Sequence, residues 1–200
     1  LRRMYQKGEN LVYYLTVQNQ NYVMPALPDG AEEGILNGLY RLPDEGAAGG
    51  EARAHLLASG SIVTEALRAR RILREDYGVT AAVWSVTSFK RLHLDGEDTE
   101  RWNLRHPARP PRRSWLEQSL AGSTGAFVLA SDYVKALPES LARWFPRPPV
   151  VLGTDGFGRS ESRAALRRFF EVDAATIAYG ALVDLVRQGA LDGAVADRAQ

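Results

Sequence analysis

The sequence predicts an α/β fold with three layers, α/β/α, around a mostly parallel sheet of about five strands. Short apolar runs alternate along the chain with longer amphipathic segments, which is typical of parallel strands joined by helices. Residues 149–163 show this pattern as a strand, a triple-glycine loop and a capped helix. Hydrophobic residues make up 45% of the 200 positions, which is enough to fill the core of one domain.

The first residues predict the end of one domain and the start of another. Residues 9–17 form an apolar run that predicts a strand, and the prolines within residues 24–30 exclude a helix and mark a boundary. A lone strand is not stable in water, and the chain opens at Leu1 rather than at methionine. We therefore expect the sequence to begin inside a longer protein, with residues 1–28 ending a preceding domain and residues 29–200 forming the main domain.

The predicted sheet begins after that boundary. A short helix over residues 31–37 precedes a strand over 38–42, and the glycine-rich residues 44–50 predict a hairpin loop or a flexible connector. Further strands are expected over 52–58 and 80–86. The helix between them has apolar residues at three- and four-residue spacing and ends at a glycine: Ile62, Ala66, Ala69, Leu73, Tyr77 and Gly78.

The central region predicts less regular helices. Thr87 or Ser88 is expected to cap a helical region that Asp95 and Gly96 interrupt, and the proline-rich residues 106–113 then cross the surface. The apolar positions of this region are Phe89, Leu92, Trp102 and Leu104.

A capping box at Ser114 and Glu117 predicts the next helix start, because each side chain can bond to the backbone of the other residue. A strand over residues 126–130 follows. Asp132 is expected to cap a segment that buries five apolar side chains: Tyr133, Leu137, Leu141, Trp144 and Phe145.

The last part of the chain predicts a strand over 150–152 and two helices. Ser160 or Ser162 is expected to cap the first helix, which buries three residues: Leu166, Phe169 and Phe170. Asp173 opens the second helix and Gly189 stops it. Its apolar face consists of Ile177, Ala178, Ala181, Leu182, Leu185 and Val186.

Composition excludes several classes of function. The chain has 25 Lys and Arg residues against 24 Asp and Glu residues, so no nucleic-acid partner is implied. It has no cysteine, which excludes disulfides, thiolate metal sites and cysteine nucleophiles and is consistent with a cytoplasmic location. The apolar run over residues 11–17 is shorter than the roughly 18 residues of a membrane span, so no membrane partner is expected.

Catalytic patterns are absent from the sequence. The three histidines, His55, His93 and His106, have no metal-ligand spacing, and a structural role is expected for each. No G-x-S-x-G motif is present to supply a serine nucleophile. We therefore predict no catalytic, cofactor-binding or metal-binding residue in this chain.

The glycine loop is the one candidate site. Its glycines read G-x-x-G-x-G, which matches neither the dinucleotide motif nor the phosphate-binding P-loop, so their expected use is backbone conformation. Asp155 and Glu161 could form ion pairs with Arg159 and Arg163 that fix the loop, or could hold a cation; a role at an interface is also open. The candidate loop or interface residues are Gly153, Asp155, Gly156, Gly158, Arg159, Ser160 and Arg163.

Five runs of sequence resemble one family, in order and over nearly the whole chain. They comprise residues 21–34, 83–89, 95–103, 152–160 and 170–174. Together they resemble the C-terminal region of the homodimeric bacterial pyruvate dehydrogenase decarboxylating component, a transketolase-like enzyme that depends on thiamine diphosphate. Where Val23 stands, members of that family often carry histidine, so no titratable role is transferred to this position.

The resemblance implies two cofactor-binding domains followed by a C-terminal α/β domain that chiefly builds the dimer. Residues 1–28 would be the end of the pyrimidine-binding domain and a linker, and residues 29–200 the transketolase C-terminal-like domain. In the family, Mg²⁺ on the diphosphate is held by a Gly-Asp-Gly motif and a downstream asparagine, and a glutamate of the middle domain protonates the cofactor's aminopyrimidine. This chain has no Gly-Asp-Gly. Thiamine diphosphate and Mg²⁺ are therefore expected on domains upstream, and the 200 residues alone are expected to be inactive.

Three hypotheses follow. In the first, the chain is part of an enzyme that decarboxylates pyruvate and acetylates the lipoyl group of a partner, dihydrolipoamide acetyltransferase, while this domain scaffolds a cytoplasmic homodimer. The second is a free-standing α/β module that binds phosphate or a nucleotide at the Gly153–Ser160 loop. The third is a purely structural interaction domain.

Overall fold

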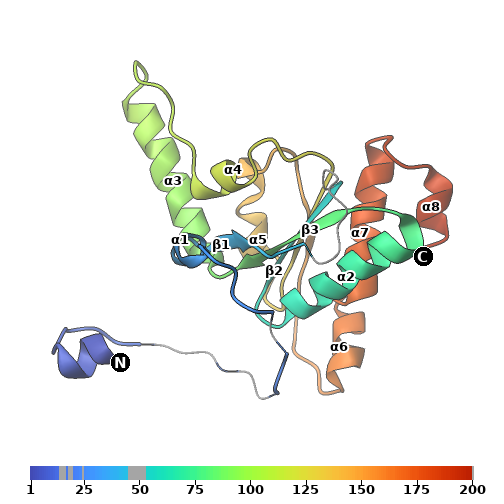
Figure 1. The fold of residues 1–200 in the computed structure, drawn as a ribbon, viewed down its shortest axis with the longest axis horizontal. Helices are drawn as coiled ribbons and strands as arrows, with labels where there is room; N and C mark the ends of the chain where they lie inside the picture. The colour runs from blue at the N-terminus through green and yellow to red at the C-terminus, as the bar shows by residue number, and fades with distance from the viewer. Residues whose placement is uncertain (14–16, 18–19, 24, 45–52, 200) are drawn as a thin grey trace.

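The computed structural model describes residues 1–13, 17, 20–23, 25–44 and 53–199. Its strands form one sheet in the order β1-β3-β2-β4-β5 (Figure 1). β1 runs antiparallel to β3, and the other pairs are parallel. The predicted class, a mostly parallel sheet of five strands between helices, is confirmed. The strands are β1 (Leu39–Arg41), β2 (Ala54–Ser59), β3 (Ala81–Val86), β4 (Ala126–Ala130) and β5 (Val150–Leu152).

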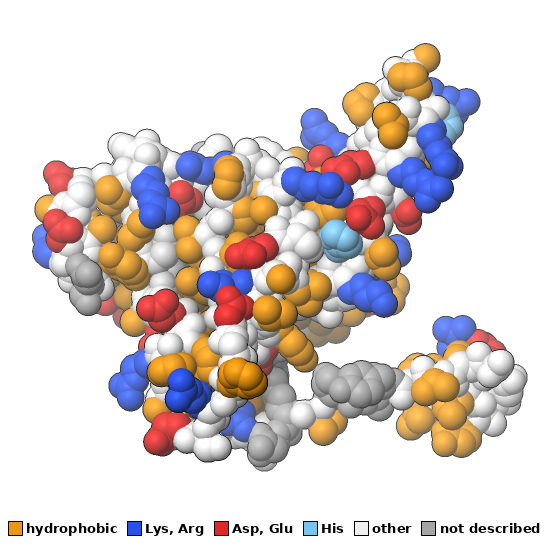
Figure 2. All heavy atoms as spheres, turned by 180° about the vertical axis from the view of Figure 1, so that it is seen from behind, with side chains coloured by type: hydrophobic (Ala, Val, Ile, Leu, Met, Phe, Trp, Pro, Cys, Tyr) orange, Lys and Arg blue, Asp and Glu red, His pale blue; other side chains and the backbone are white. Residues whose placement is uncertain are grey.

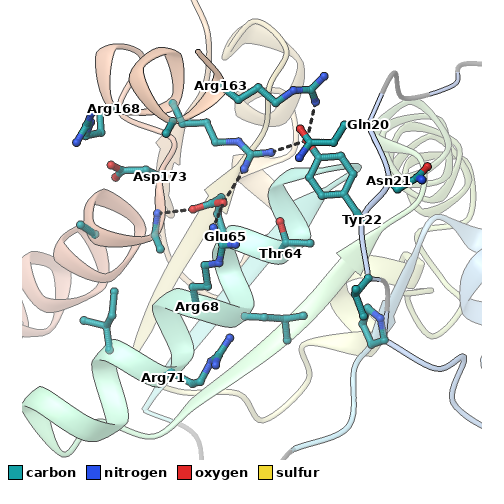
Figure 3. A pocket seen from close by; sticks show the side chains of 18 residues that line it. Gln20, Asn21, Tyr22, Thr64, Glu65, Arg68, Arg71, Arg163, Arg168 and Asp173 are labelled. Carbon is teal, nitrogen blue, oxygen red and sulfur yellow. Dashed lines mark hydrogen bonds and ion pairs between the residues drawn. The ribbon is translucent and has the colours of Figure 1, made fainter.

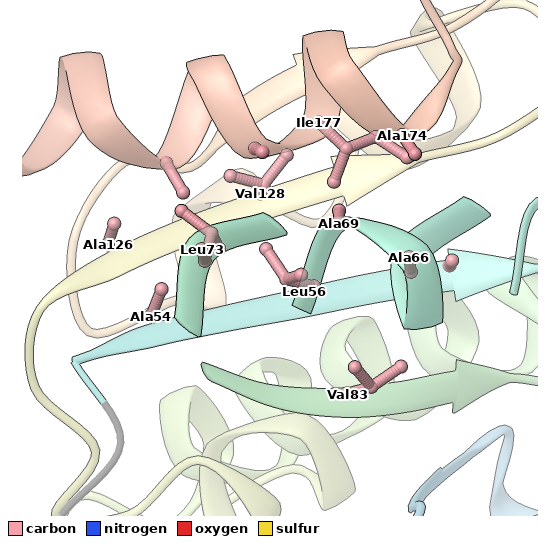
Figure 4. Close-up of a cluster of buried hydrophobic side chains, with 14 of the residues drawn as sticks. Ala54, Leu56, Ala66, Ala69, Leu73, Val83, Ala126, Val128, Ala174 and Ile177 are labelled. Atoms are coloured by element: carbon pink, nitrogen blue, oxygen red, sulfur yellow. The ribbon is translucent and has the colours of Figure 1, made fainter. Parts of the chain in front are cut away.

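Helices cover both faces of the sheet. One buried cluster joins the sheet to α2 (Ile62–Tyr77) and α7 (Ala174–Arg187), and a second joins it to α3 (Phe89–Arg105) and α4 (Trp115–Ser119). Successive residues of a strand point to opposite faces, and β2 follows this rule: Leu56 lies in the first cluster and Leu57 in the second. Figure 4 shows the first cluster, in which Leu56 and Val128 lie beneath Leu73 of α2 and Ile177 of α7.

Shorter helices complete the described chain. They are a π-helix near the N-terminus (Arg2–Gln6), α1 (Glu32–Asn37), α5 (Ala136–Glu139), a 3₁₀ turn (Ala142–Trp144), α6 (Arg163–Phe169) and α8 (Gly193–Asp197). The N-terminal π-helix lies apart from the rest of the molecule (Figure 1). None of the helices in the described ranges is both long and apolar enough to cross a membrane.

Most of the predicted helix boundaries are confirmed by their caps. Hydroxyls of Ser88 and Ser162 and the carboxylate of Asp173 accept backbone N–H bonds at the starts of α3, α6 and α7. Ser114 and Glu117 form the predicted capping box. At the other end, α2 stops at Gly78, which has the left-handed conformation that glycine adopts at no steric cost.

The predicted break at Asp95 and Gly96 is wrong, because α3 is one continuous helix. A Cβ atom at Gly96 would lie 2.4 Å from ring atoms of Trp144, so glycine is required for close packing rather than for a turn. The neighbouring Asp95 carboxylate accepts a hydrogen bond from the backbone N–H of Trp115 at 2.6 Å. The helix projects from the domain with many charged side chains along it (Figure 2). Leu104, one of the apolar residues of this region, is 82% exposed.

The predicted strand over residues 9–17 is also wrong in its described part. Residues 9–13 and 17 have no strand geometry, and residues 14–16 lie outside the described residues. A strand needs a hydrogen-bonded neighbour, and the sheet of the described chain is bounded by β1 and β5. Of the predicted connector over 44–50, only Asp44 is described.

Smaller corrections concern one helix cap and the burial of three side chains. Asp132 caps no helix; its carboxylate accepts a bond from the Ser61 hydroxyl at 3.4 Å, and α5 begins after Lys135 with no side-chain cap. Three side chains predicted as buried are exposed: one follows the end of β4, one lies in α5 and one ends α6. These are Tyr133, Leu137 and Phe169.

A buried carboxylate joins three helices on the first face. Glu65 of α2 is 4% exposed. Its Oε1 accepts bonds from Arg68 at 2.9 Å and from Arg167 of α6 at 2.7 Å, and its Oε2 accepts the backbone N–H of Ala174 at 3.1 Å. Because the Ala174 N–H belongs to the first turn of α7, Glu65 also neutralises the positive end of that helix.

Replacing Gly96 with alanine is expected to destabilise the protein by about 1–3 kcal/mol, because the new methyl group displaces Trp144 from a packed position. Chemical denaturation of the Gly96→Ala variant measures this. Gly193→Ala is the matched control, since a Cβ there meets nothing within 4 Å and alanine favours the helix. Equal stability of the two variants would contradict the packing argument.

Replacing Glu65 with glutamine is expected to cost roughly 3–5 kcal/mol of unfolding free energy, because it leaves the largely buried Arg167 without its carboxylate. Glu75→Gln, which removes a carboxylate from a solvent-exposed pair on the same helix, is expected to cost less than about 1 kcal/mol. Thermal and urea denaturation compare the two, and a similar small cost for both would show that the Glu65 network contributes little.

Candidate functional site

The glycine loop lies at the carboxyl edge of the sheet, where β5 ends and α6 begins. The parallel strands β2 and β4 also end at this edge, so Ser61 and Asp132 lie beside the loop. Together they enclose a pocket of about 330 Å³. The residues that define it include Ser61, Asp132, Thr154, Gly156, Gly158, Arg159, Arg163, Arg167 and Phe170.

A lysine and an aspartate hold the start of the loop. The backbone N–H of Lys135 donates to Asp155 Oδ1 at 2.9 Å, and Lys135 Nζ lies 3.1 Å from Asp155 Oδ2. The backbone hydrogen bond and the ammonium group of Lys135 both favour the charged carboxylate and lower the pKa of Asp155 below its ordinary value. Thr154 adds two bonds to the same segment, to the carbonyls of Asp132 and Tyr133.

Two of the three loop glycines have a backbone explanation, as predicted. A Cβ at Gly153 would lie 2.8 Å from the carbonyl oxygen of Tyr133, and Gly156 has a φ of 85°. A Cβ added at Gly158 would have no atom within 4 Å. Between the last two glycines, Phe157 is 95% exposed.

The remaining candidate residues have separate environments. The Arg159 guanidinium lies 5.1 Å from the centre of the Phe169 ring, and Ser160 is exposed. Glu161 accepts the backbone N–H of Ser162 at 2.7 Å. Arg163 donates to the hydroxyl of Tyr22, which lies in the N-terminal segment.

A second cavity, of about 940 Å³, lies between this N-terminal segment and helices α2, α6 and α7. The Tyr22 hydroxyl accepts hydrogen bonds from Arg163 at 2.6 Å and from Arg167 at 3.2 Å. Arg167 also donates to the buried Glu65 (Figure 3). Sequence reasoning missed Tyr22, Arg167 and Glu65. Tyr22 and Arg163 are separated by 141 positions, and no local pattern links them.

The histidines occupy three separate places. His55 is buried in β2, stacks on Phe127 at 4.9 Å and accepts a bond from Trp84. His93 lies 3.3 Å from Glu97, and His106 ends α3 with its Nδ1 at 2.8 Å from the Trp102 carbonyl. In the part of the chain that the structure describes, no three His, Cys, Asp or Glu side chains gather in a way that could hold a metal ion.

Comparison with curated proteins finds long relatives of this chain. It is 45% identical over 194 residues to the pyruvate dehydrogenase E1 component of Pseudomonas aeruginosa, covering 96% of the chain and 22% of the relative. The protein of the same name from Escherichia coli K12 is 46% identical over 194 residues, which cover 96% of the chain and 21% of the relative. The chain thus spans about a fifth of the length of these relatives.

Solved structures share the fold. A transketolase variant from Pichia stipitis matches 87% of this chain and 21% of its own length with a TM-score of 0.56 and 19% identity. Transketolase from Leishmania mexicana matches 78% of this chain and 19% of its own length, with a TM-score of 0.52 and 19% identity. At this identity the likeness concerns the fold alone.

A family model supplies the assignment. The model described as the transketolase-like TK C-terminal domain matches residues 38–173, which include the whole sheet and the glycine loop. This is the domain that the sequence motifs resemble. The chain belongs to the transketolase-like C-terminal domain family.

Proposed function

We propose that this chain is the C-terminal domain of a homodimeric pyruvate dehydrogenase, acetyl-transferring, which decarboxylates pyruvate on thiamine diphosphate and acetylates the lipoyl group of dihydrolipoamide acetyltransferase. The observation that carries the proposal is the 41–46% identity, over nearly the whole chain, to proteins named pyruvate dehydrogenase E1 component. Because the chain spans about a fifth of those proteins, the remaining domains would lie elsewhere in a longer cytoplasmic enzyme.

Thiamine diphosphate and Mg²⁺ are assigned to the upstream domains. Two carboxylates beside the cavities of this chain form ion pairs: Glu65 with Arg68 and Arg167, and Asp155 with Lys135. They do not form the set of oxygen ligands that Mg²⁺ requires. The proposal assigns no step of the reaction to residues of this chain.

The role proposed for the domain itself is to scaffold the dimer, with the glycine loop at an interface. Phe157 is almost fully exposed at the loop tip, and Tyr133 and Val134 are exposed beside it. Exposed apolar side chains at one edge favour contact with another protein surface. Lys135 and Asp155 hold the base of the loop, below this exposed tip.

The pocket beneath the loop favours a second candidate function. Arg159, Arg163 and Arg167 line it beside Gly156 and Gly158, so an anion such as phosphate or a nucleotide has complementary charge there. Titration with ATP and inorganic phosphate separates the two candidates. Micromolar binding would favour the free-standing module, and millimolar or absent binding would eliminate it.

We expect residues 1–200 alone neither to bind thiamine diphosphate nor to release carbon dioxide from pyruvate, whereas the full-length enzyme does both and loses turnover when Mg²⁺ and cofactor are removed. Calorimetry and a carbon dioxide assay measure this, with the full-length enzyme as positive control. Turnover by the 200 residues would overturn the assignment. A coding sequence upstream of Leu1 that contains Gly-Asp-Gly and a following asparagine would support it.

Replacing Asp155 with asparagine is expected to loosen the loop and the dimer but not cofactor binding. Because the folded pKa of Asp155 is lowered, its pair with Lys135 contributes fully above the unfolded pKa of about 3.9 and is lost as pH falls through the lower folded value. The rate of amide exchange at Thr154, corrected for the pH dependence of intrinsic exchange, should therefore rise below about pH 4 in the parent. In the Asp155→Asn protein the corrected rate should not depend on pH.

Glu161→Gln is the matched control for this prediction, because the Glu161 carboxylate bonds only to the adjacent Ser162 N–H among its described contacts. The Glu161→Gln protein should show the same rise in amide exchange at Thr154 below about pH 4 as the parent. A loop that exchanges identically in all three proteins would contradict the proposed role of the pair.

A further inference from the structure

The side chain of Tyr22 attaches the segment that enters the domain to the helices. Among the described residues before Pro25, Tyr22 is the one whose side chain bonds to the helices. Its neighbours Asn21 and Val23 are exposed, and Val23 is 97% exposed. Figure 3 shows the ring of Tyr22 pointing from the segment toward α6.

The attachment is specific to a tyrosine hydroxyl. A phenol oxygen can accept two hydrogen bonds, and the two guanidinium groups supply two charged donors, Arg163 Nη1 and Arg167 Nη2. Both guanidinium centres also lie 5.8 Å from the centre of the Tyr22 ring. A phenylalanine would keep these ring contacts and lose both hydrogen bonds.

The two arginines are themselves fixed from opposite sides. Arg167 also bonds to the buried Glu65, which is tied to the first turn of α7. Arg163 is the first residue of α6 and follows directly on the glycine loop and its cap Ser162. Both arginines line the cavity beneath the entering segment and the pocket beneath the glycine loop, so they form the wall between the two.

We infer that Tyr22 is a positioning residue. Its hydroxyl, held by Arg163 and Arg167, fixes the entering segment and the glycine loop relative to one another, and so sets where residue 23 and the loop tip meet the domain that precedes them. This inference rests on the proposed function, in which a longer chain continues upstream of this segment. The occupant of that face is the preceding domain of the same protein.

The experiment uses the full-length enzyme and the variant Tyr22→Phe. We expect amide exchange to accelerate about tenfold both in residues 20–23 and in residues 156–162, as a loss of about 1.4 kcal/mol in local stability implies. We also expect kcat for pyruvate decarboxylation to fall about tenfold while the Kd for thiamine diphosphate stays within about twofold. Tyr77→Phe, which removes the same atom at the far end of α2, should change none of these.

A double-mutant cycle tests the pairing itself. Arg163→Gln should reproduce the effects of Tyr22→Phe. The fold-changes in exchange and kcat of the double variant should be smaller than the product of the two single fold-changes, because both substitutions remove the same interaction. Fully multiplicative effects would overturn the inference.

The remaining outcomes separate the inference from the proposed function. If exchange accelerates only in residues 20–23 and the loop is unchanged, the segment and loop are not coupled and the inference is wrong. If the full-length protein has no decarboxylase activity, the proposed function fails, and the exchange measurement still decides whether Tyr22 couples the two segments. Tyr22→Phe behaving like Tyr77→Phe in both assays would eliminate a positioning role.

Discussion

A parallel sheet must be covered on both faces, and this constraint determines most of the structure. Strands β2 and β4 are buried along their whole length, with alternate residues directed to the two helical layers. Loss of either layer would expose a continuous apolar face to water. Because the parallel strands end at one edge, the same constraint places the glycine loop beside Ser61 and Asp132, which are far from it in sequence.

The Glu65 carboxylate makes a polar connection within this apolar arrangement. Burying a charge is costly unless its hydrogen bonds are satisfied, and Glu65 accepts three donors from three helices. The arrangement therefore depends on the correct relative placement of α2, α6 and α7. Through Arg167 it extends to Tyr22, so the side chains of Arg167 and Tyr22 connect the segment before the domain to its interior.

The fold was largely predictable from the sequence because its signals are local. Apolar periodicity and caps such as Ser88 and Asp173 act within a few residues, and these predictions are confirmed. The errors arose where distant contacts decide the outcome: Gly96 lies inside a helix, and its lack of a side chain makes room for the Trp144 ring. The Tyr22, Arg167 and Glu65 network was missed for the same reason, whereas the position of the glycine loop followed from its strand-loop-helix pattern.

Both outer strands of the sheet are three residues long, and β1 is antiparallel to its neighbour. An outer strand this short offers few free N–H and C=O groups to a strand of another molecule. Sheets of two copies therefore have little means to join edge to edge into fibres or aggregates. Assembly of such a domain then depends on contacts away from the strand edges, which can be selected for one partner and one geometry.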